Sequence, residues 1–291
     1  MTDFFQYIIP IFNKEDILPL TLECIDRCAS RKSRIYTIID GCTDQSEKIV
    51  DEFSRRTGRD VIKLHTPDVH MLRSVNAALK LVESGFSVVM QDDILIEDEK
   101  FEEKILSLYQ KMGPRLGVIS LRMAANVALT PVIRRFPMRS ISPMIEEIDY
   151  IIKANEPQAF EVGEYGSFYP RMGAINGPNI IPWPVREKIG VLDEMLAPYG
   201  YDDPEYCLRA MKAGFINGLF PLKFRSDIHW GGTRRSKKFL AEVRSIHKRN
   251  REYVWRRHGD YISWLWKTRK DAFRGSHPLL SMADIPDCQK L

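Results

Sequence analysis

Residues 4 to 121 alternate between short apolar runs and amphipathic segments, and this alternation constrains the fold more than any other feature of the chain. Strands that alternate with helices build a mostly parallel sheet with helices on its faces. The expected strands are Tyr7–Ile11, Arg34–Ile39, Val61–Leu64, Phe86–Met90 and Leu116–Leu121. The sequence therefore predicts an α/β fold.

Two of the segments between these strands carry apolar residues three or four positions apart, which predicts helices with one apolar face. The first set is Leu72, Val75, Leu79 and Val82, and the second is Phe101, Ile105, Leu108 and Met112. Asp98 precedes the second set and is predicted to be the N-cap of that helix.

The second half of the chain has a different character. Five prolines interrupt residues 122–171, which favours an irregular insertion. Asp203 followed by Pro204 predicts the N-cap and first turn of a helix that ends near Gly214. Residues 234–257 contain ten Lys/Arg against two Asp/Glu, with apolar residues at helical spacing, which predicts a basic amphipathic helix.

The composition excludes several classes of protein. The 291 residues are 44% hydrophobic, which is enough for one large core, and a net charge of +4 gives no reason to expect a nucleic-acid partner. The five cysteines form no CxxC pair and no Cys/His cluster, so we expect a reducing compartment rather than disulfides or zinc. Without a signal sequence or an apolar stretch of ~20 residues, we expect a cytoplasmic protein, soluble or peripheral on the membrane.

Carboxylates follow two of the predicted strands, at the edge where parallel α/β sheets bind ligands. Asp40 follows the second strand and enters a glycine turn, where it could stabilise the turn or accept a hydrogen bond from a ligand. Asp92 and Asp93 follow the fourth strand. A divalent cation would remove the repulsion between these adjacent carboxylates, although the pair could also simply solvate a strand end.

Two later segments carry further candidates. Asp202 and Asp203 precede a predicted helix, where an acidic residue is the ordinary choice of cap. His229 is followed by two glycines and by Arg234 and Arg235. A lone histidine is more often structural than a ligand, but the glycines permit close backbone approach and the arginines can bind phosphate.

In their order along the chain, these residues resemble the family 2 glycosyltransferases of GT-A fold. Pro10-Ile11-Phe12-Asn13 matches the family's Pro-x-x-Asn start, and Ile39-Asp40-Gly41-Cys42-Thr43-Asp44 resembles its Asp-Asp-Gly-Ser-Thr-Asp turn. Gln91-Asp92-Asp93 stands at its Asp-x-Asp metal motif. Residues 179–215 resemble its acceptor-side segment with a Glu-Asp pair, so the likeness extends over roughly residues 5 to 235.

The resemblance implies a nucleotide-diphospho-sugar transferase-like fold. It implies one catalytic domain at residues 1–235, with a nucleotide-binding half at about 1–121 and an acceptor half at about 122–235. Residues 236–291 would form a basic helical extension.

The resemblance also implies roles for individual residues. Asp203 would be the catalytic base, and Asp93 with His229 would hold Mn²⁺ or Mg²⁺. Asp40 would accept a hydrogen bond from the nucleobase, and Asp92 would lie near the ribose. The other expected donor-side residues are Pro10, Asn13, Glu15, Arg73, Asn76 and Arg234, and the expected acceptor-side residues are Asp202 and Trp183.

The expected reaction follows from charge. A divalent cation would stabilise the leaving diphosphate of a UDP, GDP or dTDP sugar, and a carboxylate would take the proton of the acceptor hydroxyl. One base without a covalent nucleophile predicts inversion at the sugar. The acceptor would be a glycan or a lipid-linked glycan, and the absence of the Gln-x-x-Arg-Trp signature of processive synthases favours a single addition.

Three alternatives remain open on the sequence. Ile39 and Gln91 each replace the first acid of a family motif, which would suit a binding protein of the same fold that has lost turnover. A sugar-1-phosphate nucleotidyltransferase is disfavoured because its glycine-rich basic loop does not follow the first strand, and no P-loop or dinucleotide motif occurs. The basic helix could pack on the core or lie on an anionic membrane. The oligomeric state is left open.

Overall fold

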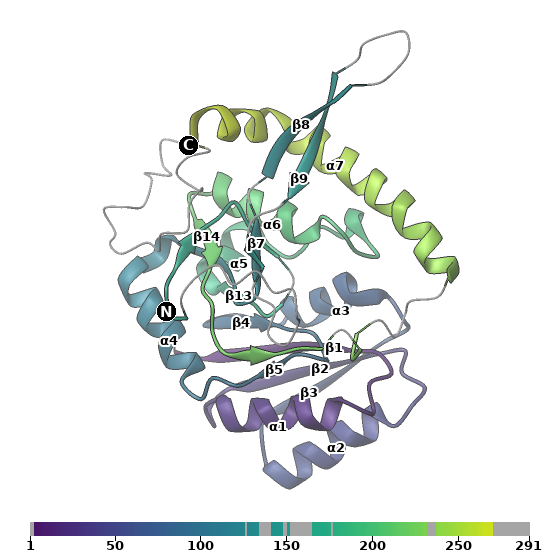
Figure 1. Ribbon diagram of the computed structural model, residues 1–291. Helices are drawn as coiled ribbons and strands as arrows, with labels where there is room; N and C mark the ends of the chain where they lie inside the picture. Colours follow the sequence, from purple (N-terminus) through teal and green to yellow (C-terminus); the bar gives the residue numbers. More distant parts are fainter. Residues whose placement is uncertain are drawn as a thin grey trace.

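The computed structural model describes residues 3–125, 127–133, 141–147, 150–151, 165–175, 177–227, 229–231 and 237–269. Its centre is an eight-stranded sheet in the order β11-β14-β6-β13-β4-β1-β2-β3 (Figure 1). The strands from the first part of the chain are β1 (Phe5–Ile11), β2 (Arg34–Asp40), β3 (Val61–Thr66), β4 (Phe86–Val89) and β6 (Leu116–Ser120). All five match the expected strands to within two residues at each end.

The remaining strands of this sheet come from later in the chain. They are β11 (Tyr169–Pro170), β13 (Asn179–Pro182) and β14 (Ile216–Leu219). Strand β13 lies between β4 and β6 and runs antiparallel to both, whereas β1 pairs in parallel with β2 and β4, and β14 pairs in parallel with β6. The mostly parallel sheet flanked by helices is the expected GT-A type of α/β fold.

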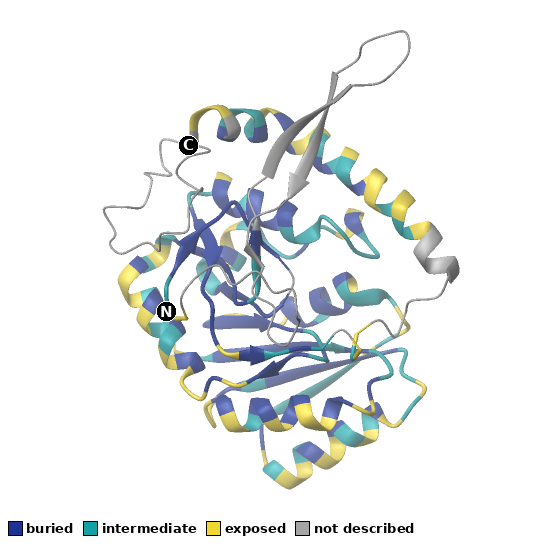
Figure 2. Ribbon diagram, viewed as in Figure 1, coloured by how far each residue is buried: buried dark blue, intermediate teal, exposed yellow. Residues whose placement is uncertain are grey.

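Helices cover both faces of the sheet because alternate residues of its strands point to opposite sides. Tyr7 and Ile9 of β1 belong to one buried cluster with α1 (Leu18–Cys28), α2 (Ser46–Thr57) and α4 (Phe101–Met112). Ile8 belongs to a second cluster, on the other face. The helices of that cluster are α3 (His70–Leu79), α5 (Trp183–Ile189), α6 (Asp202–Lys212) and α7 (Lys237–Arg269). Buried faces turned toward the sheet are visible on α1 and α2 in Figure 2.

The apolar stripes expected for α3 and α4 are buried, although Val82 lies beyond the end of α3. The predicted N-cap of α4 is wrong. Lys100 occupies the cap position, and the Asp98 carboxylate accepts a hydrogen bond from the Lys100 backbone N–H at 3.2 Å and forms an ion pair with Lys104 at 2.6 Å. The Asp98 carboxylate therefore binds the turn before α4 and one side chain of the helix, without capping a backbone N–H of its first turn.

The irregular insertion expected at residues 122–171 contains strands. Strands β8 (Val127–Ile133) and β9 (Ile141–Glu147) form an antiparallel hairpin that projects from the molecule (Figure 1). Pro131 pairs with Pro143 in its register. A two-stranded ribbon has a free edge on each strand, where the missing N–H of proline breaks no ladder bond.

The small strands complete the structure. Strands β7 (Met123–Ala125), β10 (Tyr150–Ile151) and β12 (Gly173–Ile175) form a three-stranded sheet, and β5 (Leu95–Ile96) pairs with β15 (Phe224–Arg225). Two short 3₁₀ turns occur at Gly113–Arg115 and Glu194–Leu196. Among the described residues, no helix has the length and apolar character that crossing a membrane requires.

The expected basic helix is α7, and it packs on the core. Its buried residues are spaced by three or four positions along one face, namely Asn250, Val254, His258, Ile262 and Leu265. Exposed residues occupy the other face of the helix (Figure 2). This arrangement matches the core-packed alternative of the two offered by the sequence.

Candidate active site

The acidic pair lies where β4 ends, at the carboxyl edge of the parallel strands. Asp92 is 9% exposed, and its carboxylate accepts a hydrogen bond from the backbone N–H of Phe12 at 3.1 Å. Burial, with a smaller effect of the Asp93 carboxylate, raises the pKa of Asp92 to about 7, although the nearby Lys14 ammonium and the Phe12 N–H act to lower it. Asp93 is more exposed than Asp92.

Lys14 provides the positive charge at this pair. Its side chain is only 8% exposed, and its Nζ lies 3.1 Å from Oδ2 of Asp93 and 3.9 Å from Oδ1 of Asp92. The same ammonium donates a hydrogen bond to the backbone carbonyl of Trp230. The pair therefore already holds one cation, supplied by the chain itself.

The loop after β1 is tied to the loop after β2. Asn13 has a positive φ of 50°, a conformation that asparagine adopts more readily than most residues, and its side-chain oxygen accepts from the Thr43 N–H at 2.8 Å. The Glu15 carboxylate accepts from the Gln45 N–H at 2.8 Å, and the backbone N–H of Glu15 donates to the Asp44 carboxylate at 3.0 Å. Pro10 lies within β1, just before this loop.

Asp40 ends β2 and is 1% exposed. One oxygen of its carboxylate accepts hydrogen bonds from the Thr66 hydroxyl at 2.6 Å and from the Val69 N–H at 2.8 Å. The next residue, Gly41, has φ of 67°, and a Cβ there would meet the backbone and Cβ of Asp68 at under 3 Å. The tight turn therefore requires glycine and holds Asp40 in one orientation.

Asn76 and Arg73 of α3 both contact the segment that leads to α6. Asn76 is fully buried, and its amide donates to the Leu192 carbonyl at 2.9 Å and accepts from the Leu192 N–H at 3.0 Å. Arg73 is exposed and lies 3.8 Å from the Glu194 carboxylate. These contacts join the expected donor side to the expected acceptor side.

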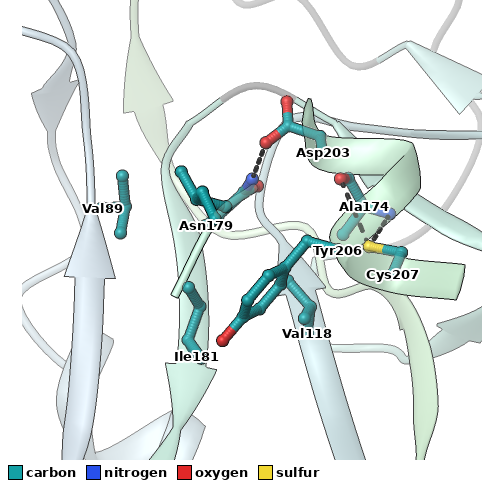
Figure 3. Close-up of a pocket in the computed structure, with 9 residues that line it drawn as sticks. Val89, Val118, Ala174, Asn179, Ile181, Asp203, Tyr206 and Cys207 are labelled. Atoms are coloured by element: carbon teal, nitrogen blue, oxygen red, sulfur yellow. Dashed lines mark hydrogen bonds between the residues drawn. The ribbon is translucent and has the colours of Figure 1, made fainter. Parts of the chain in front are cut away.

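Asp203 reaches the carboxyl end of β4 through Asn179. The Asn179 amide donates to Oδ1 of Asp203 at 3.3 Å, and Asn179 pairs with Val89 in the register of β13 and β4. Figure 3 shows Asn179 and Asp203 facing each other at a small cavity, which Tyr206 and Cys207 of α6 also line. Asn179 is 6% exposed, and its side-chain oxygen is buried without a hydrogen-bond partner among the described residues.

The predicted N-cap at Asp203 is wrong by two residues. Helix α6 begins at Asp202, and Tyr201, in a left-handed conformation with φ of 65°, occupies the cap position. The Asp202 carboxylate turns back to accept from the Gly200 N–H at 2.8 Å, and burial raises its pKa. Asp203 is thus the second residue of the helix, which leaves its carboxylate available for the contact with Asn179.

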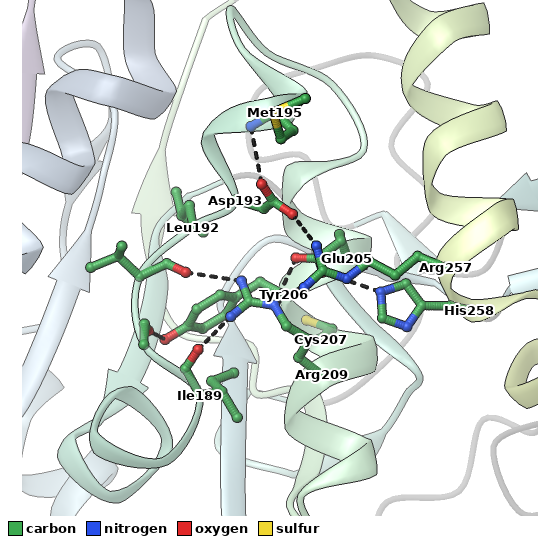
Figure 4. Close-up of polar contacts among 12 residues, drawn as sticks. Ile189, Leu192, Asp193, Met195, Glu205, Tyr206, Cys207, Arg209, Arg257 and His258 are labelled. Atoms are coloured by element: carbon green, nitrogen blue, oxygen red, sulfur yellow. Dashed lines mark hydrogen bonds and ion pairs between the residues drawn. The ribbon is translucent and has the colours of Figure 1, made fainter.

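A buried ionic network holds α6 in place (Figure 4). Glu205 is fully buried and accepts from Nε of Arg209 at 2.9 and 3.0 Å and from Nε2 of His258 at 3.1 Å. Arg209 also donates to the carbonyls of Ile189 and Val191. Since His258 belongs to α7, this network fixes the acidic start of α6 between α5 and α7.

Trp183 and His229 do not contact the acidic pair among the described interactions. Trp183 follows β13, and its backbone N–H donates to the Gly85 carbonyl at 2.8 Å. This contact places Trp183 at the amino end of β4, whereas Asp92 follows the carboxyl end. His229 is exposed, and its backbone N–H donates to the Asp227 carboxylate at 2.8 Å. The next residue, Trp230, accepts a hydrogen bond from Lys14. Arg234 and Arg235 lie outside the described residues. In the described part of the chain, no three His, Cys, Asp or Glu side chains gather as a metal site.

Two residues of the site were not predicted from the sequence. Lys14 is next to the expected Asn13, but its partners at the end of β4 are 79 residues away. Asn179 was noted only as the start of a segment. Both residues are recognised as part of the site only when the strands are aligned. The alignment brings Lys14 to the adjacent acids and Asn179 to the Asp203 carboxylate.

Known proteins were compared with this chain in sequence and in fold. Residues 7–146 match the family model described as glycosyl transferase family 2. The match includes the Asn13 loop, the Asp40 turn and the acidic pair. The match and the shared fold of solved structures confirm the expected resemblance to the family 2 glycosyltransferases of GT-A fold.

Solved structures share the GT-A fold of this chain. The crystal structure of S. aureus TarS 1-349 is 14% identical with a TM-score of 0.54, over 76% of this chain and 60% of TarS 1-349. The mannosyltransferase PcManGT from Pyrobaculum calidifontis, solved in complex with GDP-Man and Mn²⁺, is 14% identical with a TM-score of 0.53, over 75% of this chain and 55% of PcManGT. The chain thus spans little more than half the length of these two structures.

A third structure, S. aureus TarS 1-349 in complex with UDP, is 13% identical with a TM-score of 0.51, over 92% of this chain and 73% of that one. No curated protein sequence matches this chain.

Proposed function

We propose that this protein transfers a sugar from a nucleoside diphosphate to an acceptor hydroxyl, with inversion at the sugar. One observation carries the proposal. The acidic pair follows β4, and the Asp203 carboxylate binds Asn179, which pairs with Val89 at the end of that strand, so the three carboxylates lie at the same edge of the sheet. The match to the glycosyl transferase family 2 model and the nucleotide or nucleotide sugar bound to TarS and PcManGT support the donor class.

We assign a divalent cation, Mn²⁺ or Mg²⁺, to Asp93, with Asp92 beside it. The two carboxylates already hold the Lys14 ammonium, so their oxygens suit a cation. Mg²⁺ on a diphosphate needs only one or two protein carboxylates, because phosphate oxygens and waters complete its coordination. When bound, the cation would stabilise the charge on the leaving diphosphate. His229 remains a candidate for a further contact.

The chain's own residues would perform the proton transfer. An acceptor hydroxyl is a poor nucleophile until its proton is removed, and Asp203 is the proposed general base. The Asn179 amide would hold the Asp203 carboxylate in one orientation. With a single base and direct displacement at the sugar, the configuration inverts. The acceptor is proposed to be a glycan or a lipid-linked glycan.

On the donor side, we propose that Asp40 accepts a ring N–H of the nucleobase, with Asp92 near the ribose. Uracil, thymine and guanine each offer such an N–H, whereas cytosine does not. The donor is therefore expected to carry UDP, GDP or dTDP. Tighter binding of CDP than of UDP and GDP would contradict the role of Asp40.

Thermal unfolding with nucleoside diphosphates and Mn²⁺ tests the proposal. A ligand that binds only the folded protein stabilises it by about 2.7 kcal/mol at 100 times its Kd. We expect Mn²⁺ to increase the shift produced by UDP or GDP, and Asp93→Ala to remove that increase. Asp60→Ala, which breaks an ion pair with Arg34 away from the acidic pair, is the matched control. An Asp93→Ala protein that responds to Mn²⁺ as the parent does would exclude Asp93 as the metal ligand.

A further inference from the structure

Lys14 is buried at the position where the proposed cation would have to bind. Its Nζ is 3.1 Å from the Asp93 carboxylate and 3.9 Å from that of Asp92, and it also donates to the Trp230 carbonyl. A side chain that is 8% exposed and makes all three contacts is held as part of the site rather than as a surface charge.

The backbone of Lys14 is anchored independently of its side chain. Its N–H donates to the Ser46 hydroxyl at 2.9 Å, and its carbonyl accepts from Ile17 and Leu18 at 3.1 and 2.9 Å. The ammonium can therefore leave the acidic pair by rotation of the four-carbon side chain while the loop after β1 stays in place. Such a rotation would also release the carbonyl of Trp230.

A divalent cation on Asp93 and the Lys14 ammonium cannot share the same carboxylate oxygen without repelling each other. When both carboxylates are ionised, the ammonium neutralises one of their two negative charges, so a free metal ion meets a weaker attraction and an occupied oxygen. A nucleoside diphosphate changes this balance. Its phosphate oxygens ligate the metal and can accept hydrogen bonds from a lysine ammonium.

We propose that Lys14 is an internal counter-cation that keeps divalent metal off Asp93 until a nucleoside diphosphate binds. The inference rests on the proposed metal site. Metal and diphosphate then enter together, and the Lys14 ammonium moves from the acidic pair to the diphosphate. Without nucleotide, the chain itself neutralises one of the pair's two negative charges, and the Trp230 carbonyl is held by the same side chain.

Binding of Mn²⁺ alone, measured by calorimetry or by the EPR signal of the free ion, tests the inference. The parent protein should bind Mn²⁺ weakly without nucleotide, and Lys14→Met should bind it at least tenfold more tightly. Lys14→Gln should show the same gain, because its amide keeps hydrogen-bond donors but loses the charge, and it serves if Lys14→Met does not fold. Asp93→Asn added to either variant should cancel the gain.

Lys63→Met is the matched control. Lys63 also pairs with two carboxylates, Glu47 and Asp51 at 2.8 Å each, but it lies on β3 away from the acidic pair. Equal Mn²⁺ affinity in the parent, both Lys14 variants and Lys63→Met would overturn the inference. If the parent binds UDP or GDP but no protein binds Mn²⁺ with or without it, the metal site itself is wrong, and the role of Lys14 falls with it.

Discussion

Asp202 and Asp203 are neighbours in sequence, yet their carboxylates have different partners. Asp202 turns back to the Gly200 N–H, whereas Asp203 faces Asn179 at the end of β13. The first contact holds a turn, and the second reaches the edge of the sheet that carries Asp92 and Asp93. This difference separates a structural carboxylate from the proposed catalytic one.

Exchanging each carboxylate for an amide tests this assignment. Asn cannot accept the proton of the acceptor hydroxyl, so Asp203→Asn should lower the transfer rate by roughly 10²–10⁴-fold. Donor and metal binding at Asp40 and Asp93 should stay near parental. Asp202→Asn keeps an oxygen that can accept from Gly200 and should cost much less activity. The measurements are transfer rate, donor affinity and melting temperature for both variants. Near-parental transfer by Asp203→Asn would shift the search for a base to Asp202 or Glu205.

For individual residues, the sequence predicted where the acidic side chains lie but not which groups they contact. Asp92 and Asp93 follow an apolar run, and such a run must end at the edge of a buried sheet. Lys14 and Asn179 carry no comparable pattern, since their partners belong to strands that only the folded sheet brings alongside. The cap at Asp203 was misplaced because acidic residues are favoured throughout the first turn of a helix, not only at its cap.

Helix α7 contacts the loop that precedes α6 through one buried side chain. Asn250 is fully buried, and its amide donates to the carbonyls of Leu196, Tyr199 and Gly200 at 2.8, 3.1 and 2.8 Å. These carbonyls belong to the loop that leads into Asp202. The helix therefore holds the loop from which α6 begins, although none of the described contacts of Asn250 is with the acidic pair.

Asn250→Ala should leave those carbonyls without their donor. We expect a loss of about 1–3 kcal/mol in the free energy of unfolding, as for other buried hydrogen-bond partners that are removed. Transfer should fall further than stability explains, because Asp203 loses its fixed position, while the melting shift with UDP or GDP and Mn²⁺ should be kept. Glu252→Ala, at an exposed position on the same helix, is the control. A parallel loss of nucleotide response would make Asn250 a general stabiliser of the fold.

Regular elements were predicted best where their pattern was strong and local. The strands β1 to β4 and β6 are apolar runs with clear ends, and α4 repeats its apolar residues every three or four positions. The hairpin β8–β9 was missed because prolines normally argue against strands. Helix α7 was expected only to Arg257 but continues to Arg269 through Gly259, where a Cβ would meet the Trp255 ring at 3.0 Å.

The stability of the whole molecule should depend on pH through a carboxyl buried far from the site. Glu102 is 8% exposed and accepts from the Tyr7 hydroxyl at 2.8 Å and the Ser33 hydroxyl at 2.7 Å. Burial raises its pKa, and these hydroxyls only partly oppose the effect. Because the pKa of Glu102 is raised in the folded state, Glu102 contributes to the free energy of unfolding at low pH. This contribution is complete below the unfolded pKa of about 4.3 and is lost as pH rises through the folded pKa.

Glu102→Gln removes the titration but keeps an oxygen for both hydroxyls. The variant should therefore gain stability relative to the parent as pH rises from 4 toward neutrality, with no gain at the acid end. Denaturant unfolding of both proteins across this range gives the difference directly. Glu103→Gln, an exposed neighbour in the same helical turn, should run parallel to the parent. A constant difference between Glu102→Gln and the parent would show that Glu102 is not penalised when ionised.

Strand β13 has a consequence for how the protein is made. It fills the space between β4 and β6, but its residues leave the ribosome roughly 60 positions after those of β6. At about 5–20 residues per second, the nascent chain waits about 3–12 s with the facing edges of β4 and β6 unpaired. Open edges attract other strands. The protein should therefore be most prone to association with other chains during its own synthesis, before β13 and β14 complete the sheet.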